Sequence, residues 1–220
     1  MITGLLPATA GQVLYDGEAL PADFRRRSKE QLRRIQMIYQ IPDTALNPRQ
    51  RIVDIIGRPL TFYLGLKGKA MRARVAELLE MIELDPAVFM ERQPRELSGG
   101  QKQRICIARA LAANPQLIIC DEVTSALDQL VAEGVLKLLN RLQQQLGVAY
   151  LFITHDVATV RAIADEVVVM QRGRVVDQGS RSAIFTPPYQ DYTGRRFSSE
   201  PERDPDWLDH LLAQRAAHTV

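Results

Sequence analysis

Two adjacent carboxylates, Asp121 and Glu122, directly follow the short apolar run Leu117–Cys120. Such a run is typical of a strand buried in a parallel sheet, and open α/β sheets bind ligands at the carboxyl ends of their strands. The first acid can hold Mg²⁺, directly or through water, and the second can polarise an attacking water. A helix N-terminus would also attract acids, but it does not explain their position after a buried strand.

A second segment with chemical potential is Leu97–Gln101, which reads Leu-Ser-Gly-Gly-Gln and leads into a helix expected over Gly100–Ala113. Glycines let a backbone approach a ligand closely. Their N–H groups and the Ser98 hydroxyl would then face a phosphate at the helix N-terminus. The structural alternative is an ordinary serine N-cap with glycines in a turn.

A histidine follows the next predicted strand, Ala149–Ile153, in the sequence Thr154-His155-Asp156. A lone histidine is more often structural. Its place one strand after the acids favours a functional role, a hydrogen bond from His155 to a γ-phosphate. A further segment, Ser125–Asp128, reads Ser-Ala-Leu-Asp and lies between the acids and the helix expected over Gln129–Leu146.

Short apolar runs alternate with helical patterns along the chain, which predicts an α/β fold with a parallel sheet covered on both faces. The expected strands are Gln12–Tyr15, Ile35–Tyr39, Leu117–Cys120, Ala149–Ile153 and Val167–Met170. Helices are expected from Ser28, in two pieces between Arg51 and Glu83, over Gly100–Ala113, over Gln129–Leu146 and after Ile153. Pro42 to Pro48 reads as a loop.

The stretch 42–113 is helical without strands, so it is expected to form a separate lobe. Residues 1–41 and 114–180 would then form the two parts of the sheet core. Residues 181–220 read as an extended tail, with Trp207 near a last short helix.

Composition excludes several classes of protein. The net charge is +2, from 28 basic and 26 acidic residues, which is too balanced to indicate nucleic-acid binding. A local basic cluster therefore reads as a solvated helix face: Arg25, Arg26, Arg27, Lys29, Arg33 and Arg34. No apolar run reaches the ~20 residues of a membrane-spanning helix, so a cytoplasmic protein is expected. Cys106 and Cys120 have no metal or redox spacing and read as buried thiols.

In this order and spacing, the segments resemble the ATP-binding subunits of ABC transporters. Leu97–Gln101 matches the signature motif, Leu117–Glu122 matches Walker B, and Ser125–Asp128 matches the D-loop. His155 matches the switch histidine and Gln40 matches the Q-loop glutamine. The resemblance implies a P-loop-NTPase-like core with an inserted α-helical subdomain.

The resemblance also implies a role for each residue. Asp121 and Gln40 would hold Mg²⁺, Glu122 would be the general base, and His155 would contact the γ-phosphate of ATP. The signature would clamp ATP held by the opposite subunit, through Ser98, Gly99, Gly100 and Gln101. The D-loop would lie at the dimer interface, through Ser125, Ala126, Leu127 and Asp128. The implied partners are a second ABC ATPase subunit and membrane permease subunits at the inner face of the membrane.

The subfamily resembled is that of the oligopeptide, dipeptide and nickel importers. Gln36–Gln40, Ala45–Arg49 and Ile184–Tyr189 carry this likeness. Ile41 departs from it, because those proteins have a short acidic or amide residue there. Gln190–Gly194 also departs, because it replaces a more apolar start of a helix.

The P-loop pattern G-x-x-x-x-G-K-[ST] is missing from these residues. The single Gly-Lys pair, Gly68-Lys69, has Tyr63 in place of the first glycine and Ala70 in place of serine or threonine. Ile2–Pro7 resembles the family segment that follows the Walker-A helix. An incomplete N-terminal part of the core is therefore expected.

The missing P-loop has two expected consequences. Without a P-loop strand, apolar edges and faces should be exposed on the strands Leu117–Cys120 and Ala149–Ile153. The chain alone should also neither bind nor hydrolyse ATP. The first alternative is a degenerate, non-catalytic interaction subunit or a gene remnant. The second is an ABC ATPase of DNA repair, which the absence of sustained heptads disfavours.

Overall fold

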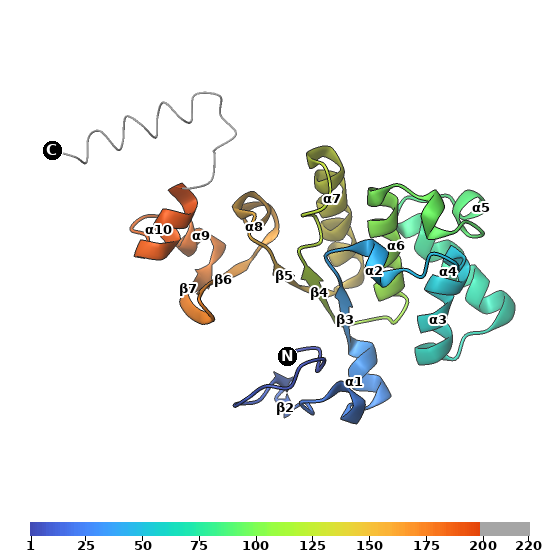
Figure 1. The fold of residues 1–220 in the computed structure, drawn as a ribbon, viewed down its shortest axis with the longest axis horizontal. Coiled ribbons are helices and arrows are strands. Elements are labelled where there is room, and N and C mark those ends of the chain that lie inside the picture. The colour runs from blue at the N-terminus through green and yellow to red at the C-terminus, as the bar shows by residue number, and fades with distance from the viewer. Residues whose placement is uncertain (199–220) are drawn as a thin grey trace. The chain divides into compact units, whose positions relative to one another are not determined.

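The computed structural model describes residues 1–198 and divides the chain into two units, Met1–Ile153 and Thr154–Val220 (Figure 1). The first unit contains a three-stranded sheet in the order β3-β4-β5, and both strand pairs are parallel. The strands are β3 (Ile35–Ile38), β4 (Leu117–Asp121) and β5 (Ala149–Ile153). The predicted α/β fold with a parallel sheet is confirmed.

Helix α7 (Gln129–Leu146) joins β4 to β5, as a connection between parallel strands requires. Its first turn is capped by Asp128, whose side chain accepts a 3.1 Å hydrogen bond from the N–H of Val131. It ends at Gly147, whose φ of 64° lies in the left-handed region that favours glycine.

Between β3 and β4 the chain forms helices only. They are α2 (Pro42–Ala45), α3 (Ile52–Leu64), α4 (Gly68–Met81), α5 (Pro86–Phe89) and α6 (Gly99–Leu111). The sequence predicted a loop where α2 forms. Pro42 occupies the first helical position of that single turn, where its fixed φ suits a helix and its missing N–H costs nothing.

One hydrophobic core joins these helices to the sheet. Fully buried side chains from α3, α4, α6, β4 and α7 meet in it, including Ile56, Leu79, Ile107, Ile118 and Leu139. Burial of each such side chain contributes about 1.5–3 kcal/mol. The helical stretch and the sheet therefore stabilise each other.

Strand β5 lies at the edge of the three-stranded sheet. Its side chains alternate: Tyr150 and Phe152 pack against the core, whereas Leu151 and Ile153 are 37% and 48% exposed. The prediction that this strand exposes apolar side chains is confirmed. The same prediction for Leu117–Cys120 is wrong, because β4 is the central strand and both its faces are covered. Ile118 and Cys120 lie in the core with the helices, and Ile119 packs with Leu20 and Ile35.

The N-terminal residues form a small hairpin, β1 (Leu14–Tyr15) and β2 (Glu18–Ala19), followed by α1 (Lys29–Arg34). The helix expected from Ser28 is confirmed as α1, and Ser28 caps it through reciprocal hydrogen bonds with Gln31. The expected strand Gln12–Tyr15 is shorter than its sequence pattern indicated, because β1 contains only Leu14 and Tyr15.

The basic cluster around α1 serves the fold. Arg27 is 6% exposed and donates hydrogen bonds to the carbonyl oxygens of Pro21 and Ile2. Arg33 pairs with Glu30 at 2.7 Å. The interpretation of the cluster as a solvated helix face is therefore wrong for Arg27, which is buried.

The second unit is described as far as residue 198. It contains α8 (Val157–Ile163), β6 (Glu166–Gln171), β7 (Arg174–Ser180), α9 (Arg181–Ile184) and α10 (Asp191–Ser198). The sequence assigned Val167–Met170 to the parallel sheet, but β6 pairs antiparallel with β7. The reason is the tight turn at Arg172 and Gly173, whose positive φ angles are those of a two-residue hairpin.

The segment after Ser180 is more ordered than the extended tail that the sequence predicted, because α9 and α10 form there. The expected last helix near Trp207 lies outside the described residues.

Candidate functional site

The two candidate catalytic acids stand at the carboxyl edge of the sheet. Asp121 is the last residue of β4 and pairs in register with Ile153 of β5. Glu122 follows, and its N–H donates a 2.8 Å hydrogen bond to the carbonyl oxygen of Ile153. Its φ of 47° is left-handed, which costs a non-glycine residue about 1–2 kcal/mol. Strained backbone held by neighbouring structure is characteristic of functional sites.

Gln40 lies two residues beyond the end of β3 and contacts Glu122. Its side-chain amide donates hydrogen bonds to Glu122 Oε2 at 2.9 Å and to Ser125 Oγ at 3.3 Å. The Ser125 hydroxyl in turn donates to the carbonyl oxygen of Glu122 at 3.0 Å. The structure therefore brings together Gln40, Glu122 and Ser125, three residues that the sequence singled out.

The signature segment begins helix α6. Ser98 is the N-cap, and its hydroxyl accepts from the N–H of Gln101 at 3.3 Å. The Gln101 side chain accepts from the N–H of Ser98 at 3.0 Å, which completes a capping box. The structural alternative considered for Ser98 thus forms. It leaves the N–H groups of Gly99 and Gly100 in the first helical turn, where they have no carbonyl one turn earlier.

The two glycines differ in their surroundings. A Cβ on Gly100 would lie 2.4 Å from a methyl carbon of Val131 in α7, so close packing requires glycine there. A Cβ on Gly99 would lie 3.7 Å from Leu127, which is an ordinary contact. Gly99 is exposed, and a side chain there would fit without disturbing α7.

Helix α6 is also tied to the segment that follows Gln40. Lys102 pairs with Asp43 of α2 at 2.7 Å. Arg109, two turns further along α6, donates a hydrogen bond to the carbonyl oxygen of Ala45. The signature helix and the Q-loop segment are thus joined by two direct contacts.

His155 belongs to the second unit and follows directly after the end of β5. Its carbonyl oxygen accepts a 2.6 Å hydrogen bond from Arg196 of α10. The proposed role of its imidazole beside Glu122 stays a prediction.

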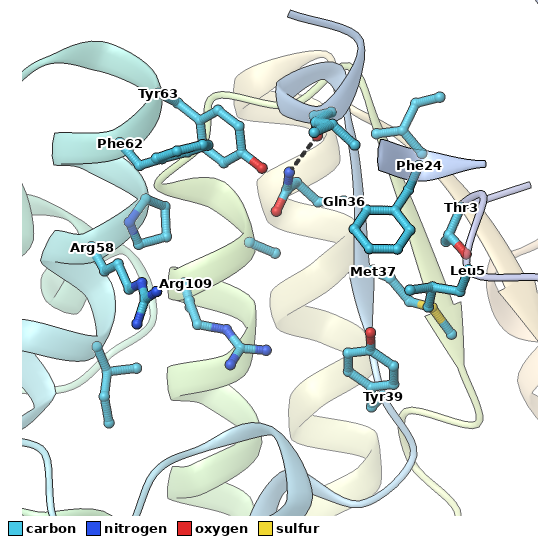
Figure 2. Close-up of a pocket in the computed structure, with 15 residues that line it drawn as sticks. Thr3, Leu5, Phe24, Gln36, Met37, Tyr39, Arg58, Phe62, Tyr63 and Arg109 are labelled. Atoms are coloured by element: carbon cyan, nitrogen blue, oxygen red, sulfur yellow. Dashed lines mark hydrogen bonds between the residues drawn. The ribbon is translucent and has the colours of Figure 1, made fainter. Parts of the chain in front are cut away.

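A cavity of about 460 Å³ in the first unit was missed by sequence reasoning. Figure 2 shows Arg58, Phe62 and Tyr63 lining it from α3, and Arg109 lining it from α6. The remaining lining comes from β3, α1 and the N-terminal residues, and includes Gln36, Met37, Tyr39, Phe24, Thr3 and Leu5. A signal did exist in the sequence: two adjacent aromatic residues, Phe62 and Tyr63, at the end of an amphipathic helix.

A neighbouring cavity of about 330 Å³ is lined by Ala45, Asn47 and Gln50, next to the Q-loop. Arg58 and Arg109 line both cavities. Within residues 1–198 neither arginine forms an ion pair with a carboxylate. The two cavities together make an aromatic and cationic surface beside Gln40's strand.

The cysteines take no part in this site. Burial raises the pKa of the Cys106 thiol to about 11 and that of Cys120 to about 12. Both thiols stay protonated near neutral pH, which agrees with the predicted buried, inert cysteines. Among the described residues, no group of three or more histidine, cysteine or acidic side chains could form a metal site by itself.

Comparison with known families decides the identity of this arrangement. Residues 1–125, more than half of the chain, match the family described as ABC transporter. The chain belongs to the ABC transporter family. Its fold agrees with solved ABC structures. CbiO1 of Clostridium perfringens, part of the ABC transporter complex CbiONQ, superposes with a TM-score of 0.74 at 24% identity, covering 96% of this chain and 80% of CbiO1.

A second solved relative is an ATP-binding cassette determined as a dimer in a post-hydrolysis state with ADP and phosphate. It is 31% identical, has a TM-score of 0.67, and the alignment covers 82% of this chain and 77% of the cassette. This likeness supports the ABC ATPase fold of the chain.

Three similar relatives carry the names of import or transport ATP-binding proteins. A peptide import ATP-binding protein of Brucella abortus is 42% identical over 202 residues, covering 91% of this chain and 60% of the relative. The oligopeptide transport ATP-binding protein OppF of Lactococcus lactis is 41% identical over 203 residues, covering 92% and 63%. The glutathione import ATP-binding protein GsiA of Escherichia coli is 43% identical over 201 residues, covering 91% and 32%.

This ABC chain therefore spans less than two thirds of the length of these relatives. In the part that the structure describes, none of the helices has the length and apolar character needed to cross a bilayer.

Proposed function

We propose that this chain is an ATP-binding subunit of an ABC importer that takes up peptides or a similar small solute. The observation that carries the proposal is the contact of Gln40, Glu122 and Ser125 at the carboxyl edge of a parallel sheet. In a sheet of this kind that edge is the place for a nucleotide. The names of the import relatives support the transported class.

Each acid has a defined part in this proposal. Glu122 accepts a proton from the attacking water as general base, and Gln40 orients its carboxylate. Asp121 fits a Mg²⁺ ligand, because among the described residues no hydrogen bond or ion pair engages its carboxylate. Magnesium is commonly held by one or two carboxylates together with waters and the phosphates of a nucleotide. When bound, Mg²⁺ would neutralise charge on the β- and γ-phosphates of ATP.

The β- and γ-phosphates also need backbone amides and a lysine, which a P-loop provides. None of the 220 residues supplies that pattern. We therefore propose that this chain's own nucleotide site works only when a P-loop is supplied to it. The residues of that site would be Asp121, Glu122, Gln40 and His155. Ser98, Gly99 and Gly100 would serve a different site, that of an opposite subunit, with Ser125–Asp128 at the interface.

The membrane partner is proposed to dock on the two joined cavities beside Gln40. Their aromatic side chains would take an apolar residue of a permease helix, and Arg58 and Arg109 would attract a carboxylate on it. In this proposal the subunit would lie on the cytoplasmic face of the inner membrane. Substitution Arg58→Glu should reduce co-purification with the permease, whereas Lys69→Glu on exposed α4 should not.

The absence of the P-loop pattern favours a second candidate, a non-catalytic interaction subunit. Turnover by the purified chain tests this candidate, because hydrolysis abolished by Glu122→Gln would exclude it. We expect no hydrolysis above blank, with ATP-dependent retention of an intact ABC ATPase subunit. Failure to retain either an ATPase subunit or a permease would overturn the importer proposal.

A further inference from the structure

Helix α10 is firmly attached to the rest of the second unit. Thr193, 1% exposed, donates a 2.8 Å hydrogen bond to the carboxylate of Asp177 in β7. The ring of Phe197 stacks on Phe185 at a centroid distance of 4.6 Å and meets Tyr189 edge-on at 5.5 Å. A polar anchor and an aromatic anchor together fix both the position and the rotation of this helix.

This attachment places the side chain of Arg196 next to the backbone of His155. Its guanidinium donates a 2.6 Å hydrogen bond to the His155 carbonyl oxygen, across 41 positions of the sequence. The preceding residue, Arg195, donates a 3.1 Å hydrogen bond to the carbonyl oxygen of Asp191 within its own helix. A hydrogen bond from a charged donor is about twice as strong as one between neutral groups.

Local hydrogen bonds also hold the segment around His155. The N–H of Asp156 donates to the Thr154 hydroxyl at 3.1 Å, and the Asp156 side chain caps α8 by accepting from Ala158 at 3.0 Å. These bonds are local and fix the start of α8. The bond from Arg196 ties the same segment to a distant element, so it limits rotation of the peptide that carries the histidine.

We infer that Arg196 is a positioning residue for His155. It holds the His155 peptide so that the imidazole is presented in one orientation, and it makes that orientation depend on the docking of α10. This inference rests on the proposed role of His155 as the switch histidine. It extends that role by assigning control of the histidine to a C-terminal helix that contains no residue of the nucleotide site.

The test is NMR spectroscopy of the full chain without nucleotide, comparing Arg196→Ala, Arg195→Ala and Arg196→Lys. The imidazole signal of His155 is assigned with His155→Gln. In Arg196→Ala the carbonyl ¹³C signal of His155 should move upfield and its imidazole signal should broaden or shift. Hydrogen exchange at the amides of Asp156 and Ala158 should accelerate by on the order of tenfold, as expected for loss of a charged hydrogen bond. Arg195→Ala should leave all of these signals in place.

Rescue distinguishes positioning from general loosening of the helix. Lysine keeps the charge and can donate to the same carbonyl, so Arg196→Lys should recover most of the His155 signals. The ring signals of Phe197 show whether α10 stays docked. If Arg196→Ala undocks α10, the result for Arg196→Lys decides. The inference is overturned if the His155 signals do not recover in Arg196→Lys.

Unchanged His155 signals in Arg196→Ala, or equal shifts in Arg195→Ala, also overturn it. Because no nucleotide is used, these outcomes are independent of the importer proposal, which fails instead if the chain retains no partner.

Discussion

The side-chain amide of Gln40 donates a 2.9 Å hydrogen bond to the carboxylate of Glu122, 82 positions away in the sequence. Strand register explains this contact. Ile38 of β3 pairs with Cys120 of β4, and Gln40 and Glu122 each lie two positions after these paired residues. Gln40 also precedes α2, which is bound to the signature helix through Asp43 and Lys102. Movement of α2 would therefore change the surroundings of the proposed general base.

The Gln40–Glu122 contact can be measured as a coupling free energy of unfolding. Both side chains are partly exposed, so a double-mutant cycle with Gln40→Ala and Glu122→Ala should give about 0.5–1.5 kcal/mol. Urea unfolding of the four proteins supplies the values. Gln40→Ala combined with the distant Glu80→Gln should be additive within about 0.5 kcal/mol. A coupling free energy of zero between Gln40 and Glu122 would mean that the contact does not form in solution.

A second prediction concerns Glu83, whose carboxylate pairs with Arg104 of α6 and Arg141 of α7. Hydrogen bonds from these arginines lower the pKa of Glu83 below its ordinary value of 4.5. A lowered pKa in the folded state stabilises the fold above the ordinary pKa, and this stabilisation is lost as the pH falls through the folded value. Glu83→Gln should therefore destabilise the chain at pH 7, by about 0.5–1 kcal/mol because the pairs are solvent-screened.

The pH dependence provides the control for Glu83. The difference between wild type and Glu83→Gln in urea unfolding should shrink below pH 4.5 and vanish at the lowest pH at which the chain still folds. Glu80→Gln, on the exposed face of α4, should show little difference at any pH. A Glu83 effect that grows on acidification would contradict the ion-pair account.

A third prediction follows from β5. With Leu151 and Ile153 exposed on an edge strand, the isolated chain should self-associate. Leu151→Lys should lower the associated fraction in sedimentation velocity without loss of stability. Phe152→Ala, whose side chain faces the core, should instead destabilise the fold by about 3 kcal/mol. A wild-type monomer with one sharp melting transition above ~60 °C would count against this prediction.

Local chemistry made much of this structure predictable. The apolar run before Asp121 is β4, the Ser98 and Ser28 patterns are capping boxes, and Gly147 ends α7. These features depend on residues within one turn or strand of each other. Sequence reasoning therefore located the strand that ends at Asp121 and the capped start of α6.

Features set by long-range contacts were not predictable. Nothing local indicated that Gly100 faces Val131, or that Arg58 and Arg109 line one surface. The predicted pairing of Val167–Met170 was also wrong, because a short apolar strand has the same sequence pattern in a parallel sheet and in a hairpin. The turn at Arg172–Gly173 was the signal that would have separated the two.

The central claim, that the signature of this chain completes a partner's nucleotide site, is tested most directly by ATP-dependent co-purification with an intact ABC ATPase subunit. Gly99→Asp places a negative charge at the exposed first position of α6, where a side chain fits and the fold should survive. Gly99→Ala is the neutral control.

We predict that Gly99→Asp abolishes the pairing through repulsion of the γ-phosphate, that Gly99→Ala largely keeps it, and that Glu122→Gln leaves both the pairing and the remaining turnover nearly unchanged. Equal loss from Glu122→Gln and Gly99→Asp would contradict the account, because it would show that a P-loop is supplied to this chain's own site.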